Sequence, residues 1–327
     1  MKLNLVPHII PAVMAAAAAM LPLTAQATTW PEKPIRMVVP FAPGGNTDSV
    51  ARIVASALSK ELDKTVLVEN LAGASGTIGA SHVAKAAPDG YTVLMGTVGT
   101  QAINMSLFNS LSESSLKDFV PVTLVASVPN VLVVNKDLPV KAVADLIAYA
   151  KAQPHPVTFA SPGVGSSIHL SGEMFKTAIQ LPMTHIPYRG SAPALTDLVG
   201  GQVQFMFDNL PPSLPFIKNG RLKALAVTSA KRSPLLPEVP TMIESGFPNF
   251  EIGSWNGIMV PAGTPPEVIN KLNETLQKIT ATREFKDRIQ QLGGEAQSVG
   301  PEAFSVFVQS EYKKWGEVIS AAGISKQ

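Results

Sequence analysis

Three glycine-rich segments hold the residues of this sequence whose types and spacing best suit binding chemistry. They are APGGNTD, AGASGTIG and SPGVGSSIH, at residues 42–48, 72–79 and 161–169. Glycine lets the backbone approach a ligand closely, and the amides that begin a helix attract anions. Backbone amides together with serine and threonine hydroxyls can hold a buried carboxylate by hydrogen bonds. The three segments therefore predict an anion site without a fixed cationic side chain.

The same glycines also have a purely structural interpretation. Gly44 and Gly45 would let the chain turn sharply between a strand and a helix, while Asn46 or Thr47 caps that helix. The position of the segments favours binding, because each one follows a predicted strand and precedes a predicted helix. In open α/β sheets, ligands collect at such loops, beyond the carboxyl ends of the strands.

Catalytic and metal-binding motifs have little support in this sequence. It contains no G-x-S-x-G elbow and no lysine that completes a phosphate-binding loop, and Ile168 stands where a dinucleotide fingerprint needs its third glycine. The histidines after residue 27 form no H-x-x-x-H pattern and have no cysteine partner: His82, His155, His169 and His185. Only His169 adjoins a glycine segment, and a packed residue in a first helical turn explains it equally well. We therefore predict no catalytic residue, no metal and no cofactor.

Alternating strands and helices must position these segments. Strands are predicted at 35–40, 65–70 and 91–97, and a helix whose apolar face comprises Val50, Ile53, Val54, Ala57 and Leu58 follows the first of them. The pattern repeats with a strand at 128–135, a helix near 140–152, the segment VTFASPGVGSSIHLSGEMF at 157–175 and a strand at 203–209. Continuous apolar strands are typical of parallel sheets that are covered on both faces.

The C-terminal third reads as helical. Thr264-Pro265-Pro266-Glu267 predicts a capping box ahead of an apolar stripe, and a last helix is predicted at 301–323. We expect these helices to pack back on the first α/β unit, so that the chain crosses between domains near 128 and 255. This predicts an α/β fold with a discontinuous domain 1 (28–127 and 255–327), a domain 2 (128–254) and a ligand cleft between them.

Composition and the N-terminus indicate a secreted globular protein. The 327 residues carry a net charge of +2 without a basic run, which argues against nucleic-acid binding. Residues 1–27 predict a secretory signal peptide that is cleaved after Ala27. A membrane anchor is the alternative, but Pro11 and Pro22 interrupt the apolar run. The absence of cysteine favours the bacterial periplasm.

Several long motifs, in order along residues 28–327, resemble the substrate-binding proteins of tripartite tricarboxylate transporters, the Bug family of periplasmic solute receptors. The motifs are WPEKPIRMVVPFAPGGNTDSVAR, VENLAGASGTIGASHVAKAAPDGYTVLMGT, ASPGVGSSIHLSGEMF, IPYRGSAPALTDLVGGQVQFMFDN and LKALAVTSAKRSPLLPEVPTMIESGFPNFE.

This resemblance implies a type II-like flytrap, in which two α/β domains close on an organic acid or amino acid. It implies a monomer that delivers its carboxylated ligand to the membrane components of the transporter. The residues that it places at the cleft are Phe41, Gly44, Gly45, Asp48, Ala74, Ser75, Gly76, Thr97, Ser161, Gly165, Ser166, Ser167, His169 and Asp208.

Three charged residues near these segments keep alternative interpretations. Asp48 is also a favourable partner of a helix dipole, and Asp208 can serve as the cap of a turn. If either carboxylate faces the cleft, it favours a ligand that also carries an ammonium group, or it acts only through hydrogen bonds and water. Arg189 is the nearest candidate cation, although a solvated position is the simpler interpretation.

Two other functions remain open on the sequence. A ligand-sensing subunit for a signalling receptor would share the fold, and a secreted hydrolase would use His169 with a nearby carboxylate. The lack of an assembled nucleophile, base and orienting group argues against the hydrolase.

Overall fold

The computed structural model describes residues 1–2 and 30–326, and the predicted signal peptide at 1–27 lies outside these residues except for its first two. The strands are β1 (Ile35–Val39), β2 (Val66–Asn70), β3 (Thr92–Thr97), β4 (Phe119–Asn135), β5 (Val157–Ser161), β6 (Met183–Pro187), β7 (Phe205–Asn209), β8 (Leu222–Val227), β9 (Gly253–Pro261) and β10 (Glu295–Val299). The α-helices are α1 (Asn46–Leu62), α2 (Thr77–Ala84), α3 (Asn104–Leu107), α4 (Val143–Ala152), α5 (Ser167–Ile179), α6 (Ser191–Val199), α7 (Leu210–Lys218), α8 (Pro266–Ala281), α9 (Arg283–Gln291) and α10 (Pro301–Ala321). A π-helical turn, η2 (Gly99–Ile103), and two short 3₁₀ turns, η1 (Ala74–Gly76) and η3 (Glu113–Asp118), complete them.

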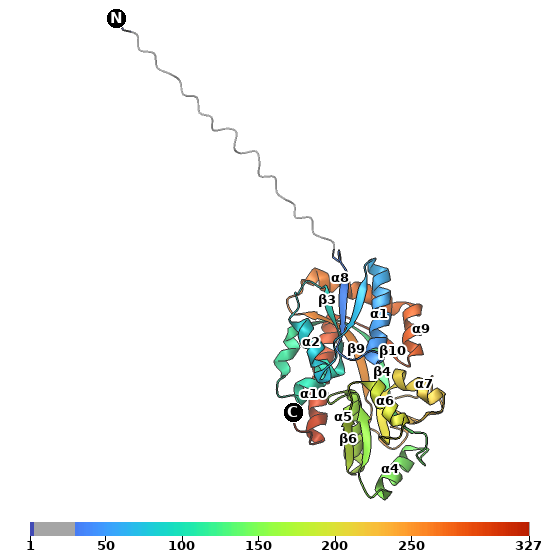
Figure 1. The fold of residues 1–327 in the computed structure, drawn as a ribbon. Coiled ribbons are helices and arrows are strands. Elements are labelled where there is room, and N and C mark those ends of the chain that lie inside the picture. The colour runs from blue at the N-terminus through green and yellow to red at the C-terminus, as the bar shows by residue number, and fades with distance from the viewer. Residues whose placement is uncertain (3–29, 327) are drawn as a thin grey trace.

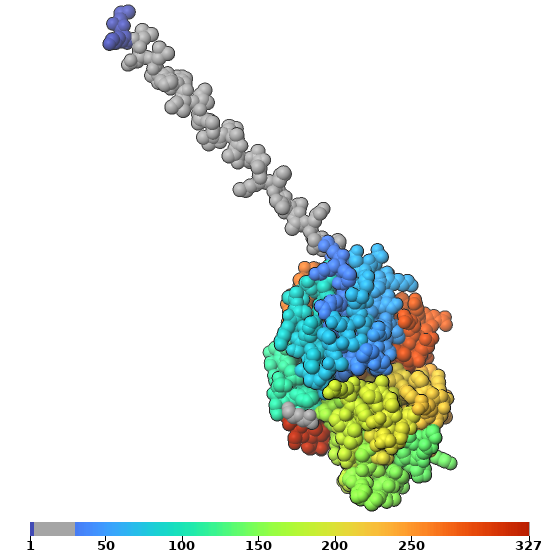
Figure 2. Space-filling view, in the orientation of Figure 1, coloured from blue at the N-terminus to red at the C-terminus, as the bar shows by residue number. Residues whose placement is uncertain are grey.

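One long strand, β4, runs through both parts of the sheet. Its first part, Phe119 to Pro129, pairs with β9, and its last part, from Asn130, pairs with β7 and β8. We call the part that contains β1, β2, β3, β9 and β10 lobe 1, and the part that contains β5, β6, β7 and β8 lobe 2. Figure 1 shows lobe 1 with α1 and α8 at the top and lobe 2 with α4 to α7 below it. Figure 2 shows the two lobes packed directly against each other.

The sheet is mixed, which corrects the expectation of parallel sheets. β1 is parallel to β2 and β3, and β5 is parallel to β6 and β7. β4 and β9, however, pair antiparallel with each other and with their remaining neighbours. The antiparallel pairs form because β4 runs through both lobes and β9 returns alongside its first part, whereas each βαβ unit stays within one lobe.

The predicted apolar helix faces are confirmed. Val50, Val54 and Leu58 of α1 are fully buried, and Ile53 is nearly so. The stripe on α8, formed by Val268, Leu272, Leu276 and Ile279, is buried in the same core. These contacts fix the N-terminal end of α1 at the carboxyl end of β1, where the first glycine segment lies.

The predicted capping box at the start of α8 is wrong. The N-cap is Pro265, which has no capping side chain, and the Thr264 hydroxyl donates to the carbonyl of Pro261. Pro266 occupies the first helical position, where its ring fixes φ near the helical value, and the helix begins without a side-chain cap. Within the described ranges, no helix is long and apolar enough to cross a membrane.

Candidate ligand-binding site

A cleft of about 60 Å³ lies between the two lobes, and its walls are uncharged. The lining residues lie at or next to the N-terminal ends of α1, η2, α5, α6 and α7, and on β9. The residues are Phe41, Ala42, Gly45, Asn46, Thr47, Thr97, Val98, Gly99, Pro162, Ser166, Ser167, Ile168, Gly190, Ser191, Asn209 and Ser254. Any charged ligand in this cleft must therefore be held by amides, hydroxyls and carboxamides.

The N-terminal ends of two longer helices face each other across this cleft. The first amides of a helix have no partner within the helix. Gly45, the N-cap of α1, supplies no side-chain acceptor for them. On α5 the Ser166 hydroxyl accepts from the amide of His169, which leaves the amides of Ser167 and Ile168 at the cleft. Because these ends carry partial positive charge, the cleft favours a negatively charged group.

The expectation that Asn46 or Thr47 caps α1 is wrong, since both residues lie inside its first turn. The turn is held instead by Asp48, whose carboxylate accepts hydrogen bonds from the Gly44 amide at 3.1 Å, from Asn70 at 3.0 Å and from Arg52 at 3.0 Å. Burial alone would raise the pKa of Asp48, but these hydrogen bonds outweigh it and lower the pKa below its ordinary value. The charge of Asp48 thus fixes the loop that carries Gly45.

The second glycine segment forms a strained left-handed turn beside the cleft. Ala74 and Ser75 have φ angles of 43° and 55°, which side chains rarely adopt. The carboxamide of Asn104 donates to the Ser75 carbonyl at 3.0 Å and helps to hold this conformation. Ser75 lies close to Gly163 of lobe 2, so the turn borders the other lobe rather than lining the cleft itself. Backbone strain of this kind is concentrated at functional sites.

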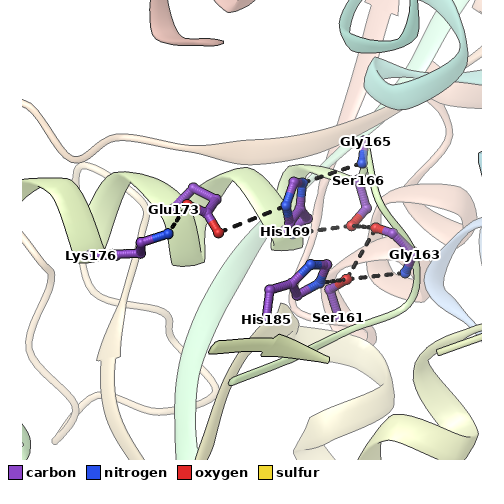
Figure 3. Close-up of polar contacts among 8 residues, drawn as sticks. All are labelled: Ser161, Gly163, Gly165, Ser166, His169, Glu173, Lys176 and His185. Carbon is purple, nitrogen blue, oxygen red and sulfur yellow. Dashed lines mark hydrogen bonds and ion pairs between the residues drawn. The ribbon is translucent and has the colours of Figure 1, made fainter. Parts of the chain in front are cut away.

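A histidine pair supports the third glycine segment, as Figure 3 shows. His185 Nε2 lies 2.6 Å from the Ser161 hydroxyl, and His169 Nδ1 accepts from the Gly165 amide at 3.3 Å. The two imidazole rings lie 4.2 Å apart between centroids. Since Nδ1 of His169 accepts a hydrogen bond, that ring carries its proton on Nε2, toward Glu173 Oε1 at 4.0 Å.

Both histidines are neutral at pH 7. Burial lowers the pKa of His169 to about 4, with Glu173 opposing and Lys176 reinforcing the shift. Burial, then the neighbouring His169 and Lys176, lowers the pKa of His185 to about 3. Ser161 is fully buried and absent from the cleft lining, so the Ser161–His185 pair positions the loop and presents no nucleophile to the cleft.

Asp208 lies directly behind the cleft wall at the end of β7. It is fully buried, and its carboxylate accepts from the hydroxyls of Ser191 at 2.9 Å and Ser213 at 2.8 Å. Burial raises the pKa of Asp208 to about 7, against the lowering effect of these two hydroxyls and of the Asn209 backbone. Because Ser191 also lines the cleft, its hydroxyl links the cleft wall to the Asp208 carboxylate.

The predicted site residues fall into two groups. Phe41, Gly45, Thr97, Ser166 and Ser167 line the cleft. The others surround it or support its loops: Gly44, Asp48, Ala74, Ser75, Gly76, Ser161, Gly165, His169 and Asp208. Arg189 is exposed and does not line the cleft.

Several lining residues were missed by the sequence analysis. Ser191 is the first residue of α6, and Asn209 ends β7 and is the N-cap of α7. The strand-to-helix boundary at each position would have indicated them. Ser254 lies on β9 and carries no local signal. Within the described ranges, no group of three or more acidic and histidine side chains is placed to hold a metal ion.

Removing the Asp48 carboxylate is expected to weaken ligand binding about tenfold, because the loop that presents Gly45 and Asn46 loses its anchor. Asp48→Ala should cost about 1.4 kcal/mol of binding free energy, measured by calorimetric titration. Glu69→Ala is the control, since it removes an exposed ion pair with Arg36 and should leave the affinity unchanged. An Asp48→Ala protein that binds as tightly as the parent would contradict this role.

Comparisons with known proteins agree with this architecture. The family model described as "Tripartite tricarboxylate transporter family receptor" matches residues 50–324. The chain is 40% identical to R. palustris Rpa4515, solved with adipate, with a TM-score of 0.88 and coverage of 91% of this chain and 100% of that chain. It is 41% identical to the periplasmic binding protein BugD, with a TM-score of 0.86 and the same coverage. It is 34% identical to MatC from Rhodopseudomonas palustris, solved with malate, with a TM-score of 0.83 and coverage of 88% and 99%.

The fold is therefore the α/β fold of periplasmic binding proteins, as predicted. The match extends over most of the chain and over nearly the whole of each solved relative. This chain belongs to the tripartite tricarboxylate transporter receptor family, the Bug family of solute-binding proteins.

Proposed function

We propose that this protein is a periplasmic receptor that captures a small carboxylate between its two lobes and delivers it to the membrane components of a tripartite tricarboxylate-type transporter. One observation carries the proposal: the N-terminal ends of α1 and α5 meet at an interlobe cleft whose lining has no charged side chain. Such ends bind anions by unpaired amides and by the helix dipole. The solved relatives with adipate and malate support the same ligand class.

The size of the cleft favours a compact ligand. A water molecule needs roughly 10–15 Å³ on this measure of volume, so about 60 Å³ accommodates roughly four to six water-sized groups. A short carboxylate of about six non-hydrogen atoms fits this space. A larger acid would require the lobes to separate.

The lobes correspond to domains that close on the ligand, with boundaries at 28–127 plus 255–327 and at 128–254. The chain crosses between the lobes within β4 and again where β9 begins, and paired crossings of this kind act as a hinge. Gly165 of lobe 2 packs against Asn104 and Leu107 of lobe 1, and Gly190 lies close to Ala42. These contacts are those of a closed form. The protein acts as a monomer in the periplasm, after cleavage of a signal peptide behind Ala27.

The ligand contacts in this proposal come from the first and third glycine segments and from two neighbouring residues, Phe41 and Thr97. Phe41, Gly45, Thr97, Ser166 and Ser167 contact the ligand, and the remaining predicted site residues hold them in place. The protein binds without catalysis, so the ligand leaves chemically unchanged.

A thermal-shift screen of short mono-, di- and hydroxycarboxylates against the mature chain tests this function. A ligand at 100 times its dissociation constant adds about 2.7 kcal/mol of stability, which raises the melting temperature by several degrees. Mass spectrometry of the bound fraction should recover the same acid. A screen in which only neutral solutes stabilise the protein, or a bound fraction that contains a converted product, would overturn the proposal.

A further inference from the structure

The floor of the cleft contains a pair of carboxamides that is incompletely hydrogen-bonded. Asn46, in the first turn of α1, lines the cleft and is 3% exposed. Its Nδ2 donates to Oδ1 of Asn256 on β9 at 3.1 Å, and Asn256 is fully buried. In the register of the sheet, Asn256 lies opposite Thr97, another lining residue. The pair therefore lies where β3, β9 and α1 meet.

Two atoms of this pair have no hydrogen-bond partner among the described residues. They are Asn46 Oδ1, an acceptor, and Asn256 Nδ2, a donor. A buried polar atom without a partner destabilises the protein, because it has lost its hydrogen bonds to water. If both carboxamides are turned by 180°, the pair still forms one bond and still leaves one donor and one acceptor unpaired. The shortage is therefore a property of the pair rather than of one orientation of its amides.

The position of Asn46 indicates what completes this pair. The adjacent helix N-terminus supplies amides for a carboxylate. In either orientation the pair leaves one donor and one acceptor unpaired, so a carboxylate oxygen, which only accepts, can satisfy only one of the two atoms. A hydroxyl can both donate to and accept from the pair, whereas a methylene can do neither. An ammonium group can donate, but the lining contains no charged side chain to balance it. The arrangement thus favours a neutral polar substituent close to the carboxylate.

We propose that Asn46, held in place by Asn256, selects carboxylates that carry a hydroxyl group over the matching acids that lack it. This inference rests on the proposed function and names the substrate class within it. Discrimination arises because an acid without the hydroxyl leaves the buried carboxamides unpaired, and sites built to bind a hydroxyl reject analogues that lack it.

Matched pairs of acids test the inference by calorimetric titration of the mature chain at constant pH and salt. The probes are L-malate with succinate and L-2-hydroxyglutarate with glutarate. The hydroxy acid of at least one pair is expected to bind at least tenfold more tightly than its partner. In Asn46→Leu, which has a similar volume and no polar atoms, the preference should fall below threefold. Asn46→Ser is a second variant that is too short to span the pair, and it should lose the preference in the same way.

Asn273→Leu is the matched control, because the Asn273 carboxamide accepts a partly buried hydrogen bond from the Thr123 hydroxyl outside the cleft lining. The Asn273→Leu protein should prefer the hydroxy acid over the plain acid as strongly as the parent does. If hydroxy and plain acids bind equally well, or if the preference survives in both Asn46 variants, the inference is wrong while carboxylate binding stands. If L-aspartate binds more tightly than L-malate, the substituent is an amine and the inference is also wrong. If no acid binds, the proposed function itself fails.

Discussion

Replacing Gly165 with alanine is expected to weaken ligand binding between tenfold and a hundredfold, because the added methyl group blocks closure of the lobes. A Cβ at Gly165 would lie 2.6 Å from Asn104 Oδ1 and 3.1 Å from Leu107 Cδ2, both in lobe 1. Overpacking of this kind costs about 1–3 kcal/mol, which corresponds to that range of affinity. The cost applies only to the closed form, since the contact is absent when the lobes separate. Calorimetry measures the affinity, and small-angle scattering measures the compaction that ligand produces.

Gly220→Ala is the matched control for this variant. Gly220 has a φ of +72°, close to the +81° of Gly165, but a Cβ there meets no atom within 4 Å. Both variants carry the same left-handed backbone strain and should lose about 1 kcal/mol of stability. Only Gly165→Ala should lose affinity and compaction. Equal affinities in the two variants would mean that this contact does not belong to the ligand-bound form.

Asp208→Asn is expected to remove a pH-dependent loss of about 4 kcal/mol in the free energy of unfolding, which the parent shows between pH 4 and pH 8. The pKa of Asp208 is about 7 in the folded protein, because burial raises it, and 3.8 is its ordinary value. Between these values the folded state retains a proton that the unfolded state has lost. The contribution of Asp208 to the free energy of unfolding is therefore fully present below pH 4 and is lost as the pH rises through 7. The difference between the two pKa values corresponds to about 4 kcal/mol.

The asparagine variant lacks this titration, so it should match the parent near pH 4 and exceed its stability at pH 8. Urea unfolding of both proteins at several pH values measures the difference. The groups that face Asp208 are the hydroxyls of Ser191 on α6 and Ser213 on α7, with Val131 opposite it on β4, and none of them titrates in this range. A difference in unfolding free energy that stays constant from pH 4 to pH 8 would contradict the assignment.

Ligand affinity should also depend on the protonation state of Asp208. An ionised Asp208 draws the Ser191 hydroxyl away from the cleft and repels an anion, so a carboxylate should bind more tightly as the pH falls through 7. The Asn variant should lose this dependence.

The parts of the fold that depend on neighbouring residues in the chain were predictable from the sequence. The buried face of α1 follows from the spacing of Val50, Val54 and Leu58, and each glycine segment lies between a strand and a helix as expected. The first half of β4 was not recognised as a strand. It contains Pro121, and proline argues against a central strand.

The parts of the site that depend on distant residues could not be predicted. Asn46 and Asn256 are 210 residues apart, and β9 has no local feature that brings its Asn256 to the first glycine segment. His185 on β6 forms a hydrogen bond with the Ser161 hydroxyl on β5, and no sequence spacing predicts this contact. The sequence could indicate where ligand-binding loops lie, but the groups that position those loops depend on tertiary packing.

The central claim is that uncharged amides and hydroxyls at two helix N-termini recognise a carboxylate. The most direct measurement is a calorimetric comparison, at pH 7, of the tightest acid from the screen with its primary amide, which has nearly the same shape and no charge. Hydrogen bonds to a charged group contribute about 1.5–3 kcal/mol each, so the amide should bind at least a hundredfold more weakly, a difference of about 2.8 kcal/mol. Equal dissociation constants for the acid and the amide would contradict the claim.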